Sequence, residues 1–152
     1  MCLTMSRNEE HDKKYIEAYK KRLKRYPYAW KIIYVCHKTP NIFSQLGYME
    51  LETNLWGKWL KSSRTNEKLT PIEKDFHQVR LGFHVFTSRE AAREAAMSSL
   101  SGEKIVKVKV DPKTFVAIGR ANDEGEGASS AVFDKIMYLR DQKPSFPGQR
   151  KK

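Results

Sequence analysis

Residues 104–110 read KIVKVKV, and this stretch decides the fold that we expect for the chain. Its apolar residues alternate with lysines, which is the period of a β-strand that has one buried face and one solvated face. The valines would face the core, whereas Lys107 and Lys109 would give the other face a positive charge. The sequence therefore predicts a half-exposed strand with a basic outer face.

Other stretches also have the composition of short strands. They are rich in β-branched and aromatic residues, are bounded by Pro, Gly or polar turns, and cover residues 28–36, 81–88, 115–118 and 131–139. Between residues 41 and 78 no period is sustained. We therefore expect irregular structure there, with one or two short strands and a mobile loop around residues 62–69.

Two helices are expected on either side of the first strands. Residues 6–25 begin with a capping-box spacing, and apolar residues then recur at helical intervals until Pro27 ends the segment. A second capping-box spacing, at Thr87 and Glu90, precedes an alanine-rich helix that extends to residue 100. The expected fold class is α+β: a small mixed β-sheet of about five or six short strands, with a basic N-terminal helix and the alanine-rich helix packed on it.

The length of 152 residues fits one ordinary domain. We expect a basic N-terminal helix over residues 1–27, a single α+β domain over residues 28–140, and a disordered basic tail over residues 141–152, where prolines and cations are frequent.

The chain is basic, with 29 Lys and Arg against 18 Asp and Glu and a formal net charge of +11. A nucleic acid or an acidic protein surface is therefore the expected kind of partner. Much of the charge lies on the first helix, where it forms either an ordinary solvated face or an arm that contacts phosphates. The candidate nucleic-acid-binding residues on this helix are Lys20, Lys21, Arg22, Lys24 and Arg25.

Trp56 and Trp59 lie among Lys58, Lys61 and Arg64. Rings interleaved with cations are the combination that single-stranded nucleic acids use for stacking and phosphate contact, so both tryptophans are candidate nucleic-acid-binding residues. The alternative is that they belong to the hydrophobic core, as most tryptophans do.

Several classes of protein and site are not expected. No stretch approaches the roughly 18 consecutive apolar residues of a membrane span, and the first residues lack the apolar block of a signal peptide. The two cysteines allow no disulfide framework, which favours a cytoplasmic protein. The histidines and cysteines lack the spacing of a zinc site, and neither a Walker loop nor a serine-hydrolase elbow is present, so we expect no metal.

An ordered set of motifs over residues 32–139 resembles the small ADP-ribosyltransferase domains of the diphtheria-toxin-like and RNA 2'-phosphotransferase-like kind. The first motif is a strand that ends in His37-Lys38-Thr39, the second is Gly82-Phe83-His84-Val85-Phe86 with Ser88 and Ala92 after it, and the third is the alternating-valine strand. The resemblance implies an NAD-binding protein that transfers ADP-ribose. It implies the cofactor-binding residues His37, Thr39, Gly82, His84, Phe86 and Ser88, and the catalytic residues His37 and Glu126.

In that family the histidine bonds the ribose beside nicotinamide, and the glutamate stabilises an oxocarbenium-like transition state by its charge. The chain departs from the pattern at three places. Lys38 replaces a glycine, His84 replaces a tyrosine, and serines stand where the family has a glutamate at the start of the last strand. The acidic candidates are then Glu124, Glu126 and Asp134.

His37 and His84 both fall at or near the ends of expected strands, so the residues themselves suggest that the two imidazoles line one cleft for a nicotinamide or adenine nucleotide. Two unrelated structural histidines are the alternative reading. Residues 82–92 also resemble short proteins of phages and mobile elements, which implies an accessory or inhibitory role. Three functions therefore stay open: an NAD-binding protein of ADP-ribosyltransferase type, a nucleic-acid-binding module, and a phage-type inhibitor of a host protein.

Overall fold

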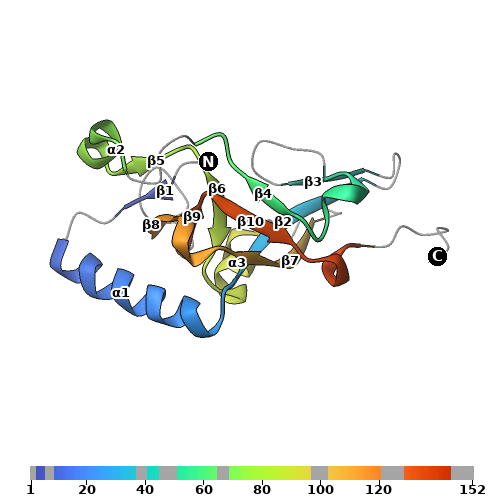
Figure 1. The fold of residues 1–152 in the computed structure, drawn as a ribbon, viewed down its shortest axis with the longest axis horizontal. Helices are drawn as coiled ribbons and strands as arrows, with labels where there is room; N and C mark the ends of the chain where they lie inside the picture. The colour runs from blue at the N-terminus through green and yellow to red at the C-terminus, as the bar shows by residue number, and fades with distance from the viewer. Residues whose placement is uncertain are drawn as a thin grey trace.

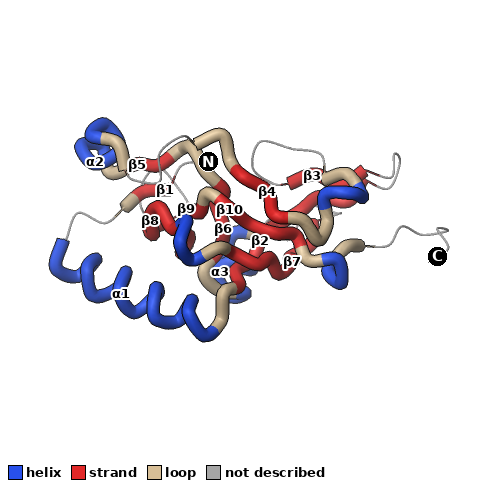
Figure 2. The backbone as a smooth tube through the Cα atoms, in the orientation of Figure 1, coloured by secondary structure: helices blue, strands red, loops and turns tan. Residues whose placement is uncertain are grey.

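The computed structural model describes residues 3–5, 9–36, 41–44, 51–64, 69–96, 103–120 and 129–144. Within these ranges the chain forms ten strands in a single sheet, three α-helices and three short 3-10 helices (Figures 1 and 2). The helices are α1 (Glu9–Arg25), α2 (Pro71–Phe76), α3 (Arg89–Ala95), η1 (Thr53–Leu55), η2 (Pro112–Thr114) and η3 (Arg140–Gln142). None of the helices in these ranges combines the length and the apolar character that crossing a bilayer requires.

All pairings between the described strands are antiparallel. The strand order is β4-β10-β7-β2-β6-β9-β8-β1-β5, and β3 pairs with β2 beside this path. The strands are β1 (Leu3–Thr4), β2 (Tyr28–Cys36), β3 (Asn41–Ser44), β4 (Trp59–Lys61), β5 (Gln78–Val79), β6 (Phe83–Phe86), β7 (Glu103–Val110), β8 (Phe115–Arg120), β9 (Ser129–Phe133) and β10 (Lys135–Tyr138).

The fold class expected from the sequence is wrong. The protein is built on a large antiparallel sheet with few helices, and not on a small mixed sheet of an α+β fold. Residues 41–78, for which irregular structure with one or two short strands was expected, supply β3, β4 and the first residue of β5, and two residues near the N-terminus supply β1. Strands of two to four residues are too short to show an alternating pattern, and ladder hydrogen bonds to an existing sheet edge stabilise them instead.

The longer elements agree better with the sequence. The strands over residues 28–36 and 103–110 are confirmed, and so is the basic first helix, which begins at Glu9. The alanine-rich helix begins one residue later than expected, because the Ser88 hydroxyl accepts a hydrogen bond of 3.0 Å from the Ala91 amide and caps it. The helix ends at Ala95, five residues before its expected end, and Ala96 after it has an extended backbone. Residues 97–100 and residues 145–152 of the expected tail lie outside the described residues.

The sheet has two halves that meet at β2 and β6, where only Trp30 and Phe86 are register partners. The expected strand over residues 131–139 is in fact two strands, because the chain leaves β9 in one half and enters β10 in the other at a single residue, Asp134. Asp134 is buried. Its carbonyl oxygen accepts a 2.8 Å hydrogen bond from the Ser62 amide, and its carboxylate accepts one from the Ser62 hydroxyl.

Helices pack on both faces of the sheet. On one face Ile16, Tyr19 and Leu23 of α1 join the main core with the valines of β7. On the other face α3 packs its alanines against Ile32 and Phe86. Figure 1 shows α1 running along one side of the sheet as a separate layer. Lys107 and Lys109 of β7 alternate with its buried valines, so they lie on the face opposite α1.

Candidate nucleic-acid interface

One row of side chains crosses four adjacent strands on the face opposite α1. The register pairs Tyr28 of β2 with Lys109 of β7, Lys109 with Met137 of β10, and Met137 with Trp59 of β4. Directly paired residues point to the same side of a sheet. The Lys109 amino group lies 6.0 Å from the centre of the Trp59 ring, so cation and ring are in contact across the strands.

A second row lies beside the first, where Trp30 pairs with Lys107. The ring of Tyr26 lies 4.8 Å from that of Tyr28 and 6.2 Å from that of Trp30, between centroids. The amino group of Lys107 lies 5.5 Å from the centre of Tyr26 and 5.3 Å from the centre of Tyr28. Rings and amino groups therefore alternate over this part of the sheet.

We call this surface the aromatic–lysine face; it consists of Tyr26, Tyr28, Trp30, Trp59, Lys107 and Lys109. Trp59 is 46% exposed, although it is one of the largest apolar side chains in the protein. Helix α3 covers the neighbouring part of the same side of the sheet. Trp30 is partly buried against the apolar residues that α3 packs on there. Lys61 of β4 pairs with Lys135 of β10, and each lies two residues from the Trp59–Met137 pair of the same strands. Both lysines therefore lie on the same side of the sheet and extend the face with positive charge.

Aromatic rings and amino groups that lie beside one another on one face suit an extended polyanion with unstacked bases. A base gains stacking energy on any of the rings, whichever base it is, while the lysines neutralise phosphates. Apart from Tyr26, which lies in the connection between α1 and β2, the face is carried by β-strands of a large sheet, and the ladder hydrogen bonds fix the geometry of that part.

The two tryptophans proposed from the sequence separate in the structure. Trp59 lies on the aromatic–lysine face, as a stacking residue requires. Trp56 is only 2% exposed, and its ring packs 5.3 Å from that of Tyr138, between centroids, within the main core. The assignment of Trp56 to nucleic-acid binding is therefore corrected: no face of its ring is open to a base.

The basic helix does not share a face with Trp59, because α1 packs on the opposite side of the sheet. Two of its cations contact the protein itself. Arg22 donates a 2.5 Å hydrogen bond to the Thr87 carbonyl oxygen, and the Lys20 amino group lies 5.2 Å from the centre of the Phe115 ring. The other candidates on this helix, Lys21, Lys24 and Arg25, are exposed.

His84, a predicted cofactor-binding residue, has both ring nitrogens beside backbone oxygens. Nε2 lies 3.0 Å from the Val79 carbonyl oxygen and Nδ1 lies 3.2 Å from that of Gly82. Burial lowers the pKa of His84, which keeps the ring neutral. Gly82 has φ 108°, and a Cβ there would lie 2.5 Å from the Val132 side chain. Both residues therefore shape the connection between β5 and β6.

The rest of the predicted nucleotide site is not brought together among the described residues. Phe86 is buried against α3, and Ser88 caps that helix. His37, Thr39 and Glu126 lie outside the described residues. In the described ranges no three or more His, Cys, Asp or Glu side chains are grouped so that they could hold a metal ion.

The sequence reasoning missed the aromatic residues of β2. The density of apolar residues over 28–36 is typical of a strand buried on both faces, so this composition does not mark Tyr28 and Trp30 as binding residues. Their alternation with Ala29 and Lys31 was the available signal, since it separates two faces. Only the pairing of β2 with β7 shows which face carries Lys107 and Lys109.

No protein-family model, curated protein or solved structure matches the chain. The geometry of the described residues is therefore what points to a function.

Proposed function

We propose that this protein binds single-stranded nucleic acid on its aromatic–lysine face. One observation carries the proposal: aromatic rings and lysine amino groups lie together on one face of β2, β7 and β4, with Trp59 exposed at one side and the Tyr26–Tyr28 pair at the other. The net charge of +11 supports a polyanionic partner.

The spacing of the rings favours single strands. Tyr28 and Trp59 are three strand positions apart, which is roughly 14 Å at about 4.8 Å per strand. Two bases stacked on these rings would be separated by one or two nucleotides, whose phosphates would lie over Lys109. In a duplex the bases stack on one another and offer no free faces, so we expect a duplex to bind more weakly.

The test is a titration of fluorescently labelled ten-nucleotide single strands, of DNA and of RNA, followed by anisotropy at two salt concentrations. Trp59→Ala should raise the Kd by about 5-fold to 150-fold, which corresponds to the loss of about 1–3 kcal/mol of stacking. The control is Phe76→Ala, which removes another highly exposed ring that lies outside this face. It should leave the Kd unchanged.

A second comparison separates the two basic surfaces. Lys107→Gln/Lys109→Gln should weaken binding and reduce the magnitude of the log–log salt slope by about 1.4, since each phosphate contact to a single strand contributes about 0.7. The matched pair Lys21→Gln/Lys24→Gln, on the opposite side of the sheet, should change neither value. Absence of micromolar binding at low salt, or an equal loss in the α1 pair, would remove the proposal.

The resemblance to ADP-ribosyltransferases supports a separate proposal, in which the protein binds NAD. Calorimetric titration with NAD, followed by mass spectrometry for released nicotinamide, tests it on the parent and on His37→Ala and Glu126→Gln. No binding at millimolar NAD, or turnover unchanged in both variants, contradicts it. The cytoplasm is the compartment that we propose for either function, because the cysteine content suits a reducing environment.

A further inference from the structure

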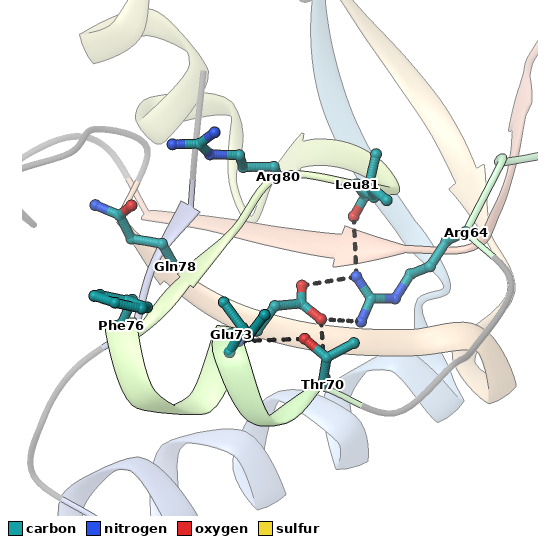
Figure 3. Close-up of a pocket in the computed structure, with 8 residues that line it drawn as sticks. Arg64, Thr70, Glu73, Phe76, Gln78, Arg80 and Leu81 are labelled. Carbon is teal, nitrogen blue, oxygen red and sulfur yellow. Dashed lines mark hydrogen bonds and ion pairs between the residues drawn. The ribbon is translucent and has the colours of Figure 1, made fainter.

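Helix α2, strand β5 and Arg64, which follows β4 in the chain, line a pocket of about 590 Å³ (Figure 3). Apolar and charged side chains both line it, and the apolar ones are open to solvent. Ile72 and Phe76, one helical turn apart on α2, are 70% and 72% exposed, and Leu81 is 57% exposed. Side chains of this size normally avoid such exposure when they are grouped, so the group indicates a binding site.

An ion pair, and not apolar packing, holds α2 in place. Arg64, whose side chain is 4% exposed, donates hydrogen bonds of 2.6 and 2.8 Å to the two carboxylate oxygens of Glu73. Glu73 also completes a capping box with Thr70 at the start of the helix. The hydrogen bonds from Arg64 hold the pKa of Glu73 below its usual range, so the carboxylate stays charged.

This arrangement leaves the apolar side chains of α2 without a role in the fold. None of the residues of α2 is buried. The Arg64 amide also donates to the Ser62 hydroxyl, which in turn donates to the buried Asp134 carboxylate. The pocket wall is therefore tied to the crossover between the two sheet halves by a polar network, while Ile72 and Phe76 face solvent.

We propose that this pocket binds a small molecule that has a compact apolar body and one anionic group. The volume falls in the range of small-molecule sites, about 300–1,000 Å³, and the eight lining residues fall far short of the roughly 20–30 residues that each partner contributes to a standard protein interface. Glu73 is already neutralised by Arg64, which leaves the exposed Arg80 as the cation that lines the pocket for an anionic ligand (Figure 3).

The first experiment uses 8-anilinonaphthalene-1-sulfonate, a fluorescent aromatic anion, with the folded full-length chain. We expect saturable fluorescence enhancement, and a Kd raised at least about tenfold by Ile72→Ser/Phe76→Ser. Since both side chains are exposed, the variant should retain the cooperative unfolding of the parent. The single variants Ile72→Ser and Phe76→Ser give the same test, with smaller losses, if the double variant does not fold.

The second experiment tests the anionic group by displacing the dye with 2-naphthoate or with the neutral naphthalene-2-carboxamide. Arg80→Gln should weaken 2-naphthoate at least about threefold and leave the carboxamide unchanged. Arg93→Gln, which removes an exposed arginine on α3, is the matched control and should change neither ligand.

Three results would overturn the proposal. One is an absence of saturable enhancement with the parent. Another is dye binding that is lost in Trp59→Ser but unchanged in Ile72→Ser/Phe76→Ser, which would assign the dye to the aromatic–lysine face. The third is a parent that sediments as an oligomer and becomes monomeric in Ile72→Ser/Phe76→Ser, which would assign the apolar walls to contact between copies of the chain.

Discussion

Replacing Lys31 by methionine should make the protein more stable at neutral pH. Lys31 lies on β2, is buried, and its amino group donates a 2.9 Å hydrogen bond to the His84 carbonyl oxygen, close to the point where the two sheet halves meet. Burial lowers the pKa of Lys31 from 10.5 to about 8. At pH 7 the folded protein therefore holds a charge that is better solvated in the unfolded chain.

The size of the effect follows from the pKa of Lys31, which is lower by about 2.5 in the folded protein than in the unfolded chain. At about 1.4 kcal/mol per unit, the buried charge destabilises the folded state by about 3 kcal/mol. Methionine fills a similar volume without charge, but it leaves the His84 carbonyl oxygen without this donor, which costs about 1 kcal/mol. The net gain expected for Lys31→Met at pH 7 is about 2 kcal/mol.

The pH dependence gives a second signature. Between pH 8 and 10.5 the unfolded chain retains the proton that folded Lys31 has released, so the unfolding free energy of the parent rises with pH in this window. Burial raises the pKa of Tyr19 and of Tyr138, which lowers stability above pH 10, where the unfolded phenols ionise. The rise is therefore measured between pH 8 and 10, and Lys31→Met should lack it.

The assay is urea denaturation followed by circular dichroism at pH 7, 8, 9 and 10. Lys104→Met removes an exposed lysine from β7 and is the matched control. It should leave both the stability at pH 7 and the rise above pH 8 unchanged. The reasoning is refuted if Lys31→Met is no more stable than the parent at pH 7 and shows the same slope between pH 8 and 10.

Three further predictions concern stability, and urea midpoints measure each. Gly119→Ala should destabilise by about 1–3 kcal/mol, because the new Cβ would lie 2.1 Å from the Thr4 carbonyl oxygen; an unchanged midpoint contradicts this. The parent should lose stability as the pH falls through 6.5, because the folded pKa of His84 is below the unfolded one, and His84→Gln should show a shallower slope between pH 7 and 5.5; equal slopes would exclude the effect. Glu73→Gln should cost about 3 kcal/mol by removing the carboxylate charge that pairs with the buried Arg64 guanidinium, and a parent-like midpoint would show that the pair is dispensable.

The longest periodic segment was the most informative part of the sequence. The alternation over residues 104–110 predicts which side chains of β7 are buried, and Val106, Val108 and Val110 are indeed buried while Lys107 and Lys109 lie on the other face. Alternation is a local property that the pleat imposes on any paired strand, so it can be recognised without knowledge of the partners.

The sheet order could not be inferred in the same way. Strand β2 pairs with β7, about 75 residues later in the chain, and no composition signal records such a pairing. The aromatic–lysine face exists only because of this pairing and that of β10 with β4. Trp56 and Trp59 illustrate the limit, because they have similar neighbours in sequence. Strand β4 begins at Trp59 and leaves that side chain exposed, whereas Trp56 is buried in the core.

The crossover at Asp134 has a consequence for how the chain folds. Strand β9 lies between β6 and β8 in one half, while β10, which begins at the residue after Asp134, lies between β4 and β7 in the other. Neither half can complete its hydrogen-bonded ladder before residues 129–138 are in place, so the halves should not appear as separate equilibrium transitions. The docking of β9 and β10 closes large loops, and this entropic barrier predicts slow refolding, on the millisecond-to-second scale of sheet proteins dominated by non-local pairing.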